Sequence, residues 1–326
     1  MAGLIVYPKF EHEYEPIKEI GSGSFGVVFE CKVKLDDTYC AVKLIRFPAS
    51  EDEEEVQRTE SRKKVQRVIN EVKMLSLAQH PNVVRYSQAW IEDYREQNRV
   101  RGYYSGSASY GPRERMMYIH MELCKGSLKS KLTEEEELRT DMAWSYFRQI
   151  LEALQFIHGK DIIHRDLKPD NIFIDNSGTV KIGDFGLALR EVVRSTTKDV
   201  SSTTSSTTKD VSSTTNSSPV GAYLYRAPEM KERDPNKPTN KVDMYALGLI
   251  VFQLFCPRRC SELELLKLTE LPGQVCEEYK VDETAKPLIL KLLQKKPSER
   301  PSAADLLQQL DTLEGKKQEA QLQKLS

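Results

Sequence analysis

No stretch of this sequence is both apolar enough and long enough to suggest a membrane span. A membrane-spanning helix needs roughly 18 or more predominantly apolar residues, and no apolar run approaches that length. The opening stretch, MAGLIVYPKF, lacks the pattern of a secretory signal peptide. We therefore expect a cytoplasmic protein with no membrane segment in this chain, although a longer parent protein could be membrane-anchored.

The chain also lacks a zinc-binding set and any large excess of charge. Cys256 and Cys260 lie four residues apart, but no histidine or second close cysteine pair completes a set of metal ligands, so we expect the six cysteines to be free or buried thiols. The 48 Lys and Arg residues nearly balance the 49 Asp and Glu residues. This balance argues against a globally basic nucleic-acid-binding protein and leaves only a local basic patch open.

The order of strand-like and helix-like patterns predicts two parts. The first is rich in strands, and its apolar helical stripe ends near Leu75. The second, after Gly126, has mainly helical periodicity. The strand-like runs are 14–44, 83–91 and 116–123, a surface insertion is expected at 95–115, and the clearest helical runs are 143–157, 241–255, 284–294 and 303–313.

An eleven-residue unit occurs twice in succession, at 195–205 and 206–216. From 195 to 218, 17 of 24 residues are Ser or Thr, so the tract cannot bury enough apolar surface to offset its ordering entropy. Two copies are too few to form a stacked repeat fold. We expect a mobile tract inside the helical part.

The run IGSGSFGVVFE carries a Gly-x-Gly-x-x-Gly spacing. Alone this spacing is weak, because dinucleotide-binding turns and ordinary hairpins share it. A dinucleotide fingerprint should open a helix, yet VVFECKV continues as a strand. We therefore expect a hairpin tip folded over a nucleotide, with backbone N–H groups close to its phosphates. Its residues are Ile20, Gly21, Ser22, Gly23, Ser24, Phe25 and Gly26.

Lys43 lies among apolar residues in the next strand-like run, CAVKLIRF. A lone strand lysine usually points to solvent. Here the glycine-rich hairpin precedes it, and Glu71 on the following helix could hold its ammonium group against phosphate oxygens.

The runs IIHRDLKPDNIFID and KIGDFGLA carry the strongest chemical signal. Phosphoryl transfer needs a carboxylate near the acceptor hydroxyl, an amide and a carboxylate for magnesium, and a cation for the transferring group. Asp166, Asn171 with Asp184, and Lys168 supply these groups in that order.

Across nearly its whole length the chain resembles eukaryotic Ser/Thr protein kinases. Ala227-Pro228-Glu229 matches a family element, Asp243 matches the aspartate of a long central helix, and Arg300 matches the expected partner of Glu229. Lys168 after HRDL is similar to the Ser/Thr branch.

The resemblance implies an α+β, bilobal fold, with a small sheet lobe containing one key helix at 1–123 and a larger helical lobe at 124–326. It also implies ATP and Mg²⁺ as cofactors, and an activation segment at 184–229 that contains the repeat. By the same resemblance, Met121 is the gatekeeper, Glu122, Leu123 and Cys124 form the adenine-binding hinge, Val28, Ala41 and Phe173 sandwich the adenine, and Leu75, His164 and Phe185 join an apolar spine.

A narrower resemblance links the chain to the kinases of the initiation factor 2 alpha subunit, and most closely to their endoplasmic-reticulum member. It rests on runs such as HPNVVRYSQAWIE, MYIHMELC and KVDMYALGLIVFQLF. It implies a serine of that subunit as the substrate, stress-induced inhibition of translation, and homodimers formed through the small lobe.

Within the activation segment, phosphates could pair with cations such as Arg165. The residues favoured for autophosphorylation are Thr214, Thr215, Ser217 and Ser218. One departure is Ala222, where related kinases usually carry a threonine that bridges the catalytic Asp and Lys. Two alternatives stay open: a Ser/Thr kinase with another substrate, and a weakly active nucleotide-binding scaffold.

Overall fold

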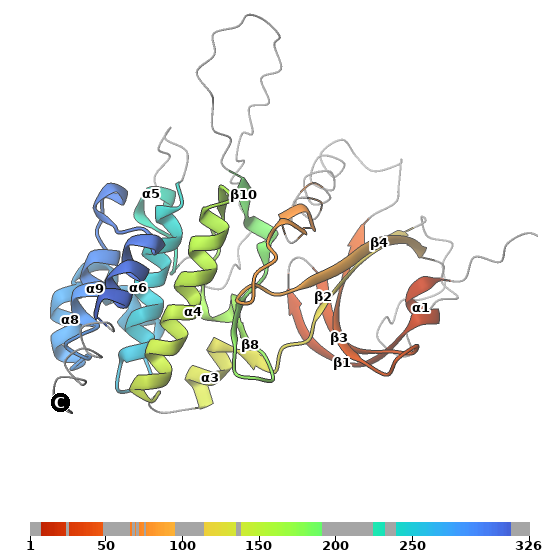
Figure 1. Cartoon of the computed structure of the whole chain (residues 1–326), viewed down its shortest axis with the longest axis horizontal. Helices are drawn as coiled ribbons and strands as arrows, with labels where there is room; N and C mark the ends of the chain where they lie inside the picture. Colours follow the sequence, from red (N-terminus) through yellow and green to blue (C-terminus); the bar gives the residue numbers. More distant parts are fainter. Residues whose placement is uncertain are drawn as a thin grey trace, which may run out of the picture.

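The computed structural model describes residues 8–23, 26–47, 66, 69, 72–74, 76–94, 114–134, 138–190, 224–231 and 239–313. Figure 1 shows a strand-rich lobe, in red to yellow, beside a helical lobe, in green to blue. This arrangement confirms the α+β, bilobal architecture expected from the sequence. Within these residues no helix is long and apolar enough to cross a membrane.

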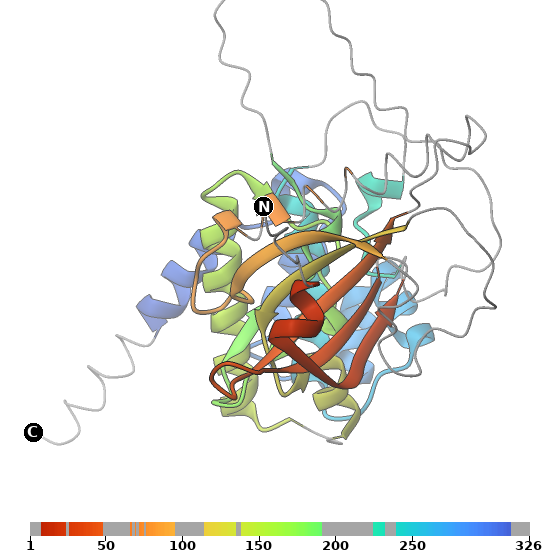
Figure 2. The ribbon, with the colours of Figure 1, turned by 90° about the vertical axis from the view of Figure 1, so that its right-hand side faces the viewer.

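The small lobe is built on a five-stranded antiparallel sheet in the order β1-β2-β3-β5-β4. One face carries an aromatic and aliphatic cluster, which the short helix α1 (Lys9–Glu13) covers (Figure 2). Phe10 of this helix stacks on Tyr118, with ring centroids 4.7 Å apart. The strands are β1 (Tyr14–Gly23), β2 (Gly26–Val33), β3 (Tyr39–Phe47), β4 (Tyr86–Tyr94) and β5 (Glu114–Glu122).

The opposite face of the sheet brings several predicted nucleotide-binding residues together. Residues directly opposite each other in an antiparallel pair share a face, and Lys43 lies opposite Val28 on one side and Ile119 on the other. Ala41, two residues from Lys43, lies opposite Met121. Ile119 belongs to the main core that extends into the helical lobe. This face therefore points toward the second lobe.

The helical lobe is organised around α6 (Lys241–Phe255), which is buried on nearly all sides. Its bounds are those predicted from the sequence. A helix that is apolar on every side can be recognised as a core helix without an alternating polar face. It packs against α4 and α9. The other helices are α3 (Leu128–Glu134), α4 (Thr140–His158), α5 (Pro228–Lys231), α7 (Glu262–Glu270), α8 (Pro272–Glu278), α9 (Lys286–Leu292) and a last helix at 303–313, with 3-10 turns η1 (Pro169–Asn171), η2 (Phe185–Leu187) and η4 (Pro297–Glu299).

Within the described residues, five short strands lie between β5 and α5, and the predicted catalytic motifs lie on the last four and the loops that join them. They are β6 (Gly126–Ser127), β7 (Ile162–Ile163), β8 (Ile172–Ile174), β9 (Val180–Ile182) and β10 (Leu189–Arg190). They form two small antiparallel sheets, β6-β8-β9 and β10-β7.

Some sequence predictions need adjustment or fall outside the described residues. The insertion predicted at 95–115 is two residues too long, because Glu114 and Arg115 belong to β5. The short helix α1 was not predicted, since five residues carry no readable period. The division between lobes at residues 123 and 124 stays a prediction; β5 ends at Glu122. Residues 191–223, with the duplicated tract, Ala222 and the favoured phosphorylation positions, lie outside the described residues.

Candidate active site

The loop between β7 and β8 brings Asp166, Lys168 and Asn171 together. Lys168 Nζ lies 3.0 Å from Asp166 Oδ2. Asn171 donates from Nδ2 to the same carboxylate oxygen at 2.9 Å and to the Asp166 carbonyl at 2.8 Å. The 3-10 turn η1, opened by Pro169, fixes this geometry by placing Asn171 just before β8. The loop thus holds one carboxylate between a cation and an amide.

Asp184 follows β9 and meets Lys43 from the other lobe. The Lys43 ammonium lies 3.3 Å from Asp184 Oδ1, although the two residues are 141 positions apart in sequence. The Lys43 side chain is only 8% exposed, while that of Asp184 is 32% exposed. Burial alone would raise the pKa of Asp184, but the charge and hydrogen bond of Lys43 outweigh it and hold the pKa below its usual value. Asp184 is therefore kept as a carboxylate, and part of its side chain remains accessible to solvent.

A buried carboxylate on α6 holds the loop between β7 and β8, the predicted catalytic loop, in place. Asp243, 1% exposed, accepts hydrogen bonds from the backbone N–H of His164 at 2.9 Å and of Arg165 at 2.8 Å. The ring of His158 contacts Oδ2, the oxygen that also accepts from His164, at 2.9 Å. Arg165 adopts a positive φ of 68°, which is unfavourable for a non-glycine residue. The paired hydrogen bonds offset this strain and orient the chain that leads to Asp166.

The predicted spine residues His164 and Phe185 are in contact. Their ring centroids lie 4.9 Å apart, and neither is exposed to solvent. The His164 ring also contacts the Gly183 carbonyl oxygen at 2.9 Å. Gly183 in turn donates its N–H to the Asn171 carbonyl at 2.9 Å. These contacts connect the catalytic loop to the segment that carries Asp184. The third predicted spine residue, Leu75, lies outside the described residues.

The glycine-rich hairpin joins β1 to β2. Gly26 has φ of 135°, and a Cβ atom there would lie 2.2 Å from the Leu44 carbonyl oxygen, so only glycine fits without a shift of the backbone. Ile20, Gly21, Ser22 and Gly23 lie in β1, and Ile20 is 43% exposed. Ser24 and Phe25 at the tip lie outside the described residues, as does Glu71, so pairing of Glu71 with Lys43 stays a prediction.

The predicted hinge follows β5. Glu122 forms an ion pair with Lys181 at 3.2 Å and accepts a hydrogen bond from the Arg85 N–H. Leu123 and Cys124 are half-buried, and burial raises the pKa of the Cys124 thiol to about 12. Phe173, half-buried in β8, would contact any side chain built on Gly183. The adenine-binding roles of these residues stay predictions.

Glu229 and Arg300 pair as the sequence predicted. The guanidinium binds both carboxylate oxygens, at 2.6 and 2.8 Å, and has no exposed surface. Arg300 also donates to three backbone carbonyls, those of Lys241, Gln294 and Lys295. This network ties α5, at the end of the predicted activation segment, to α6 and to the turn that follows α9.

The donor set fits Mg²⁺ and a nucleotide. Magnesium prefers hard oxygen ligands, and the Asp184 carboxylate provides one. Because the Asn171 amide nitrogen is hydrogen-bonded to Asp166, the Asn171 side-chain oxygen is left to serve as the second ligand. Lys43 adds a buried cation beside Asp184 for phosphate oxygens. Asn171 and Asp184 would therefore hold the metal, as the sequence predicted.

Sequence reasoning predicted a set of reacting groups, which stays a prediction, and it missed several residues that contact them. His158 and Lys181 belong to a helix end and a short strand, where no local pattern distinguishes them from other polar residues. Asp243 was recognised only through the family resemblance, and its hydrogen-bond partners were not foreseen. A lone acidic residue in the apolar run KVDMYALGLIVFQLF was the available signal, because a buried charge needs partners.

Comparison with known proteins agrees with this geometry. The family model described as protein kinase domain matches residues 14–310. The eIF-2-alpha kinase GCN2 of Arabidopsis thaliana is 36% identical over 324 residues, covering 92% of this chain and 25% of that protein. The interferon-induced, double-stranded RNA-activated protein kinase of Rattus norvegicus is 32% identical over 310 residues, covering 93% of this chain and 52% of that protein.

A third relative, GCN2 of Schizosaccharomyces pombe, is 27% identical and covers 92% of this chain and 23% of that protein. The chain thus spans from about a quarter to about half of the length of these relatives. The predicted resemblance to initiation factor 2 alpha kinases is confirmed. The finer likeness to PERK, the endoplasmic-reticulum member, stays a prediction.

Proposed function

Because the chain belongs to the protein kinase family, we propose that it transfers the γ-phosphoryl group of ATP to a serine of the alpha subunit of initiation factor 2. The observation that carries this proposal is the convergence of Lys43, Asp166, Lys168, Asn171 and Asp184 from both lobes through contacts of 2.8–3.3 Å. A structural role alone would not require two carboxylates, two cations and an amide in these contacts.

The residues divide the work of the reaction. When bound, Mg·ATP supplies the phosphoryl group and a divalent charge on its oxygens. Asp166 accepts the hydrogen bond of the serine hydroxyl and orients its oxygen for attack. Lys168, 3.0 Å from Asp166, offsets negative charge that develops during transfer. Lys43 would hold phosphate oxygens of the nucleotide, and Asn171 and Asp184 would hold the metal.

The substrate proposal rests on the relatives. GCN2 of two organisms carries the activity in its name, and both proteins match over more than nine-tenths of this chain. Phosphorylation of this factor would make the protein a stress-responsive inhibitor of translation. All six cysteines are free thiols, which suits a reducing compartment, and we propose that it acts in the cytoplasm.

Dimerisation through the small lobe is proposed on the same resemblance. That lobe exposes the apolar side chains of Leu35 (94%), Tyr39 (58%) and Ile17 (45%), which a second copy could cover. Sedimentation of the chain, alone and after incubation with Mg·ATP, tests it; a monomer at micromolar concentration in both states would exclude the dimer.

The decisive experiment incubates the chain with Mg²⁺ and γ-labelled ATP, with and without the factor, beside an Asp166→Ala variant. Labelled phosphoserine on the factor, absent with the variant, is expected. If only the chain itself became labelled, the alternative of a Ser/Thr kinase with another substrate would stand. Nucleotide binding without any transfer would instead support the scaffold alternative. Thermal melting of both proteins confirms that the variant is folded.

A further inference from the structure

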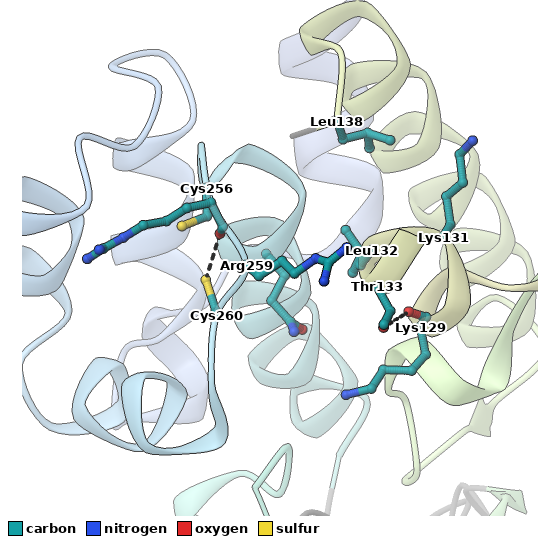
Figure 3. A pocket seen from close by; sticks show the side chains of 10 residues that line it. Lys129, Lys131, Leu132, Thr133, Leu138, Cys256, Arg259 and Cys260 are labelled. Carbon is teal, nitrogen blue, oxygen red and sulfur yellow. Dashed lines mark hydrogen bonds between the residues drawn. The ribbon is translucent and has the colours of Figure 1, made fainter. Parts of the chain in front are cut away.

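A pocket of about 100 Å³ lies on the helical lobe, between α3 and the loop that joins α6 to α7 (Figure 3). The loop side carries Cys256, Arg258, Arg259 and Cys260, and the α3 side carries Lys129. None of these residues takes part in the chemistry proposed above. Lys131 of α3 lines it as well, so two thiols and four cations share one small opening.

The two thiols lie in hydrogen-bonding contact. The Cys256 sulfur accepts hydrogen bonds from the Cys260 thiol and from the Arg258 backbone N–H. The Cys260 sulfur also lies 3.5 Å from the Arg258 carbonyl oxygen. Cys256 is 4% exposed at the end of α6, whereas Cys260 is half-buried and more open to solvent. A reagent entering the pocket would therefore reach Cys260 first.

The surroundings of this pair differ from those of the other thiols. The hydrogen bond from Cys260 lowers the pKa of Cys256 despite burial, and the Arg258 N–H and guanidinium add to the effect. Burial raises the pKa of Cys31 and Cys124 to about 12, and of Cys40 and Cys276 to about 11. The same hydrogen bond, together with burial, raises the pKa of Cys260, so the thiolate of the pair lies on Cys256 and can take up the Cys260 proton. Because the thiolate is the reactive form, this shared proton favours exchange at the 256–260 pair.

We propose that Cys256 and Cys260 form a thiol–disulfide exchange site that reacts with small anionic disulfides and closes to an intramolecular disulfide. The loop between them, 257–259, is exposed and offers room for the adjustment of side chains that an S–S bond requires. The site is independent of phosphoryl transfer.

The exchange takes two balanced steps. Cys260 passes its proton across the hydrogen bond to Cys256, attacks the disulfide RSSR and forms a Cys260–S–SR mixed disulfide, releasing RS⁻. The thiol of Cys256 gives its proton to that leaving thiolate, so the first RSH departs. The Cys256 thiolate then attacks the Cys260 sulfur, displaces the second RS⁻ and forms the Cys256–Cys260 bond. This thiolate takes a proton from water, so the external disulfide is reduced to two thiols, while the protein, which began as one thiol and one thiolate, gives up one proton and two electrons.

The charge around the pocket selects the reagent. In Figure 3, Lys129 and Arg259 extend from opposite sides into the space between α3 and the loop. Both residues are exposed, and Arg258 stacks on Tyr279, 4.1 Å from the ring centroid. Cations at a small opening raise the local concentration of anions. Oxidised glutathione, which is anionic, should therefore react faster than cystamine, a cationic disulfide.

Intact mass and thiol titration of the whole chain test the proposal. With oxidised glutathione, the wild type and a Cys276→Ser control should each lose two thiols without keeping an adduct, and peptide mapping should recover a 256–260 disulfide. Cys256→Ser should instead keep one glutathione on Cys260. No loss of thiols, or a disulfide between other cysteines, would overturn the proposal.

Rates with the two disulfides test the role of charge. Lys129→Ala and Arg259→Ala should each slow the reaction with oxidised glutathione about three- to tenfold and leave the cystamine rate unchanged or higher. Lys160→Ala, which removes a cation outside the pocket, should change neither rate. Equal wild-type rates with both disulfides, or equal slowing of both in the two pocket variants, would refute the selection of anions.

Discussion

Replacing Asp243 with asparagine tests how the helical lobe holds the catalytic loop. The carboxylate receives two backbone N–H groups and the ring of His158 on its two oxygens. Asparagine has nearly the same shape but offers one acceptor oxygen, and its amide N–H₂ would face the backbone N–H of Arg165 or His164. The change therefore keeps the volume and removes the charge and one acceptor.

The expected loss of stability follows from these contacts. A hydrogen bond to a charged group contributes about 1.5–3 kcal/mol, and a buried donor without an acceptor costs about 1–3 kcal/mol. Asp243→Asn should therefore lower the free energy of unfolding by about 3–5 kcal/mol. Activity should fall more steeply than the folded fraction, because Arg165, at φ 68°, would lose the bond that orients the path to Asp166.

The effect should depend on pH with a defined sign. Burial alone would raise the pKa of Asp243, but the hydrogen bond and charge of His158, with His164 and the Arg165 N–H, lower it below the usual value. A depressed folded-state pKa stabilises the protein above the unfolded-state pKa of about 3.9, and this stabilisation is lost as the pH falls through the folded-state pKa. The difference between wild type and variant should therefore be full near pH 7 and shrink below about pH 4.

Urea unfolding at several pH values measures these differences, and initial rates of phosphoryl transfer measure the catalytic effect. Asp141→Asn is the matched control, since Asp141 is exposed on α4 and pairs with the exposed Arg139, and its loss should stay within about 0.5 kcal/mol. If both variants unfolded at the same urea concentration, the bracing role of Asp243 would be refuted.

Three further changes have defined expectations. Lys43→Met removes the cation that keeps the pKa of Asp184 low. Phosphoryl transfer should therefore fall about 10²–10³-fold, and its dependence on Mg²⁺ should move to higher pH. Initial rates measured across pH test this, and an unchanged Mg²⁺ profile would contradict it. Arg300→Leu leaves the Glu229 carboxylate without its bidentate partner and should lower the free energy of unfolding by about 3–5 kcal/mol in urea; a change below about 1 kcal/mol would count against it. Gly26→Ala would place a Cβ atom 2.2 Å from a backbone oxygen of β3, so nucleotide titration should give weaker ATP binding, and an unaltered affinity would show that the hairpin tolerates the shift.

Local patterns in the sequence were sufficient for most of the architecture. The bounds of α6 were predicted without error, because its apolar residues continue on every side of the helix. The predicted start of β4 was three residues too early, since pairing with β5 rather than composition sets where that strand begins. Helix α1 escaped prediction because it is held by packing of Phe10 on the sheet and not by a repeat of its own.

The residues of the site also fall into two groups, those that short spacing in the sequence brings together and those that only tertiary packing brings together. Asp166, Lys168 and Asn171 lie within six residues, so their spacing alone brought them together on one loop. Lys43 and Asp184 are separated by 141 positions, and only the packing of the sheet against the helical lobe brings them to 3.3 Å.

The sequence by itself predicted most of the longer strands and helices and a candidate set of reacting groups, because periodicity and short spacing are encoded in neighbouring residues. Tertiary structure decided which groups share an environment: the carboxylate of α6 beneath the catalytic loop, and the thiol pair beside Lys129. The physical reason is that charge, burial and hydrogen bonding act through space, and residues distant in sequence acquire them only when the lobes and helices pack.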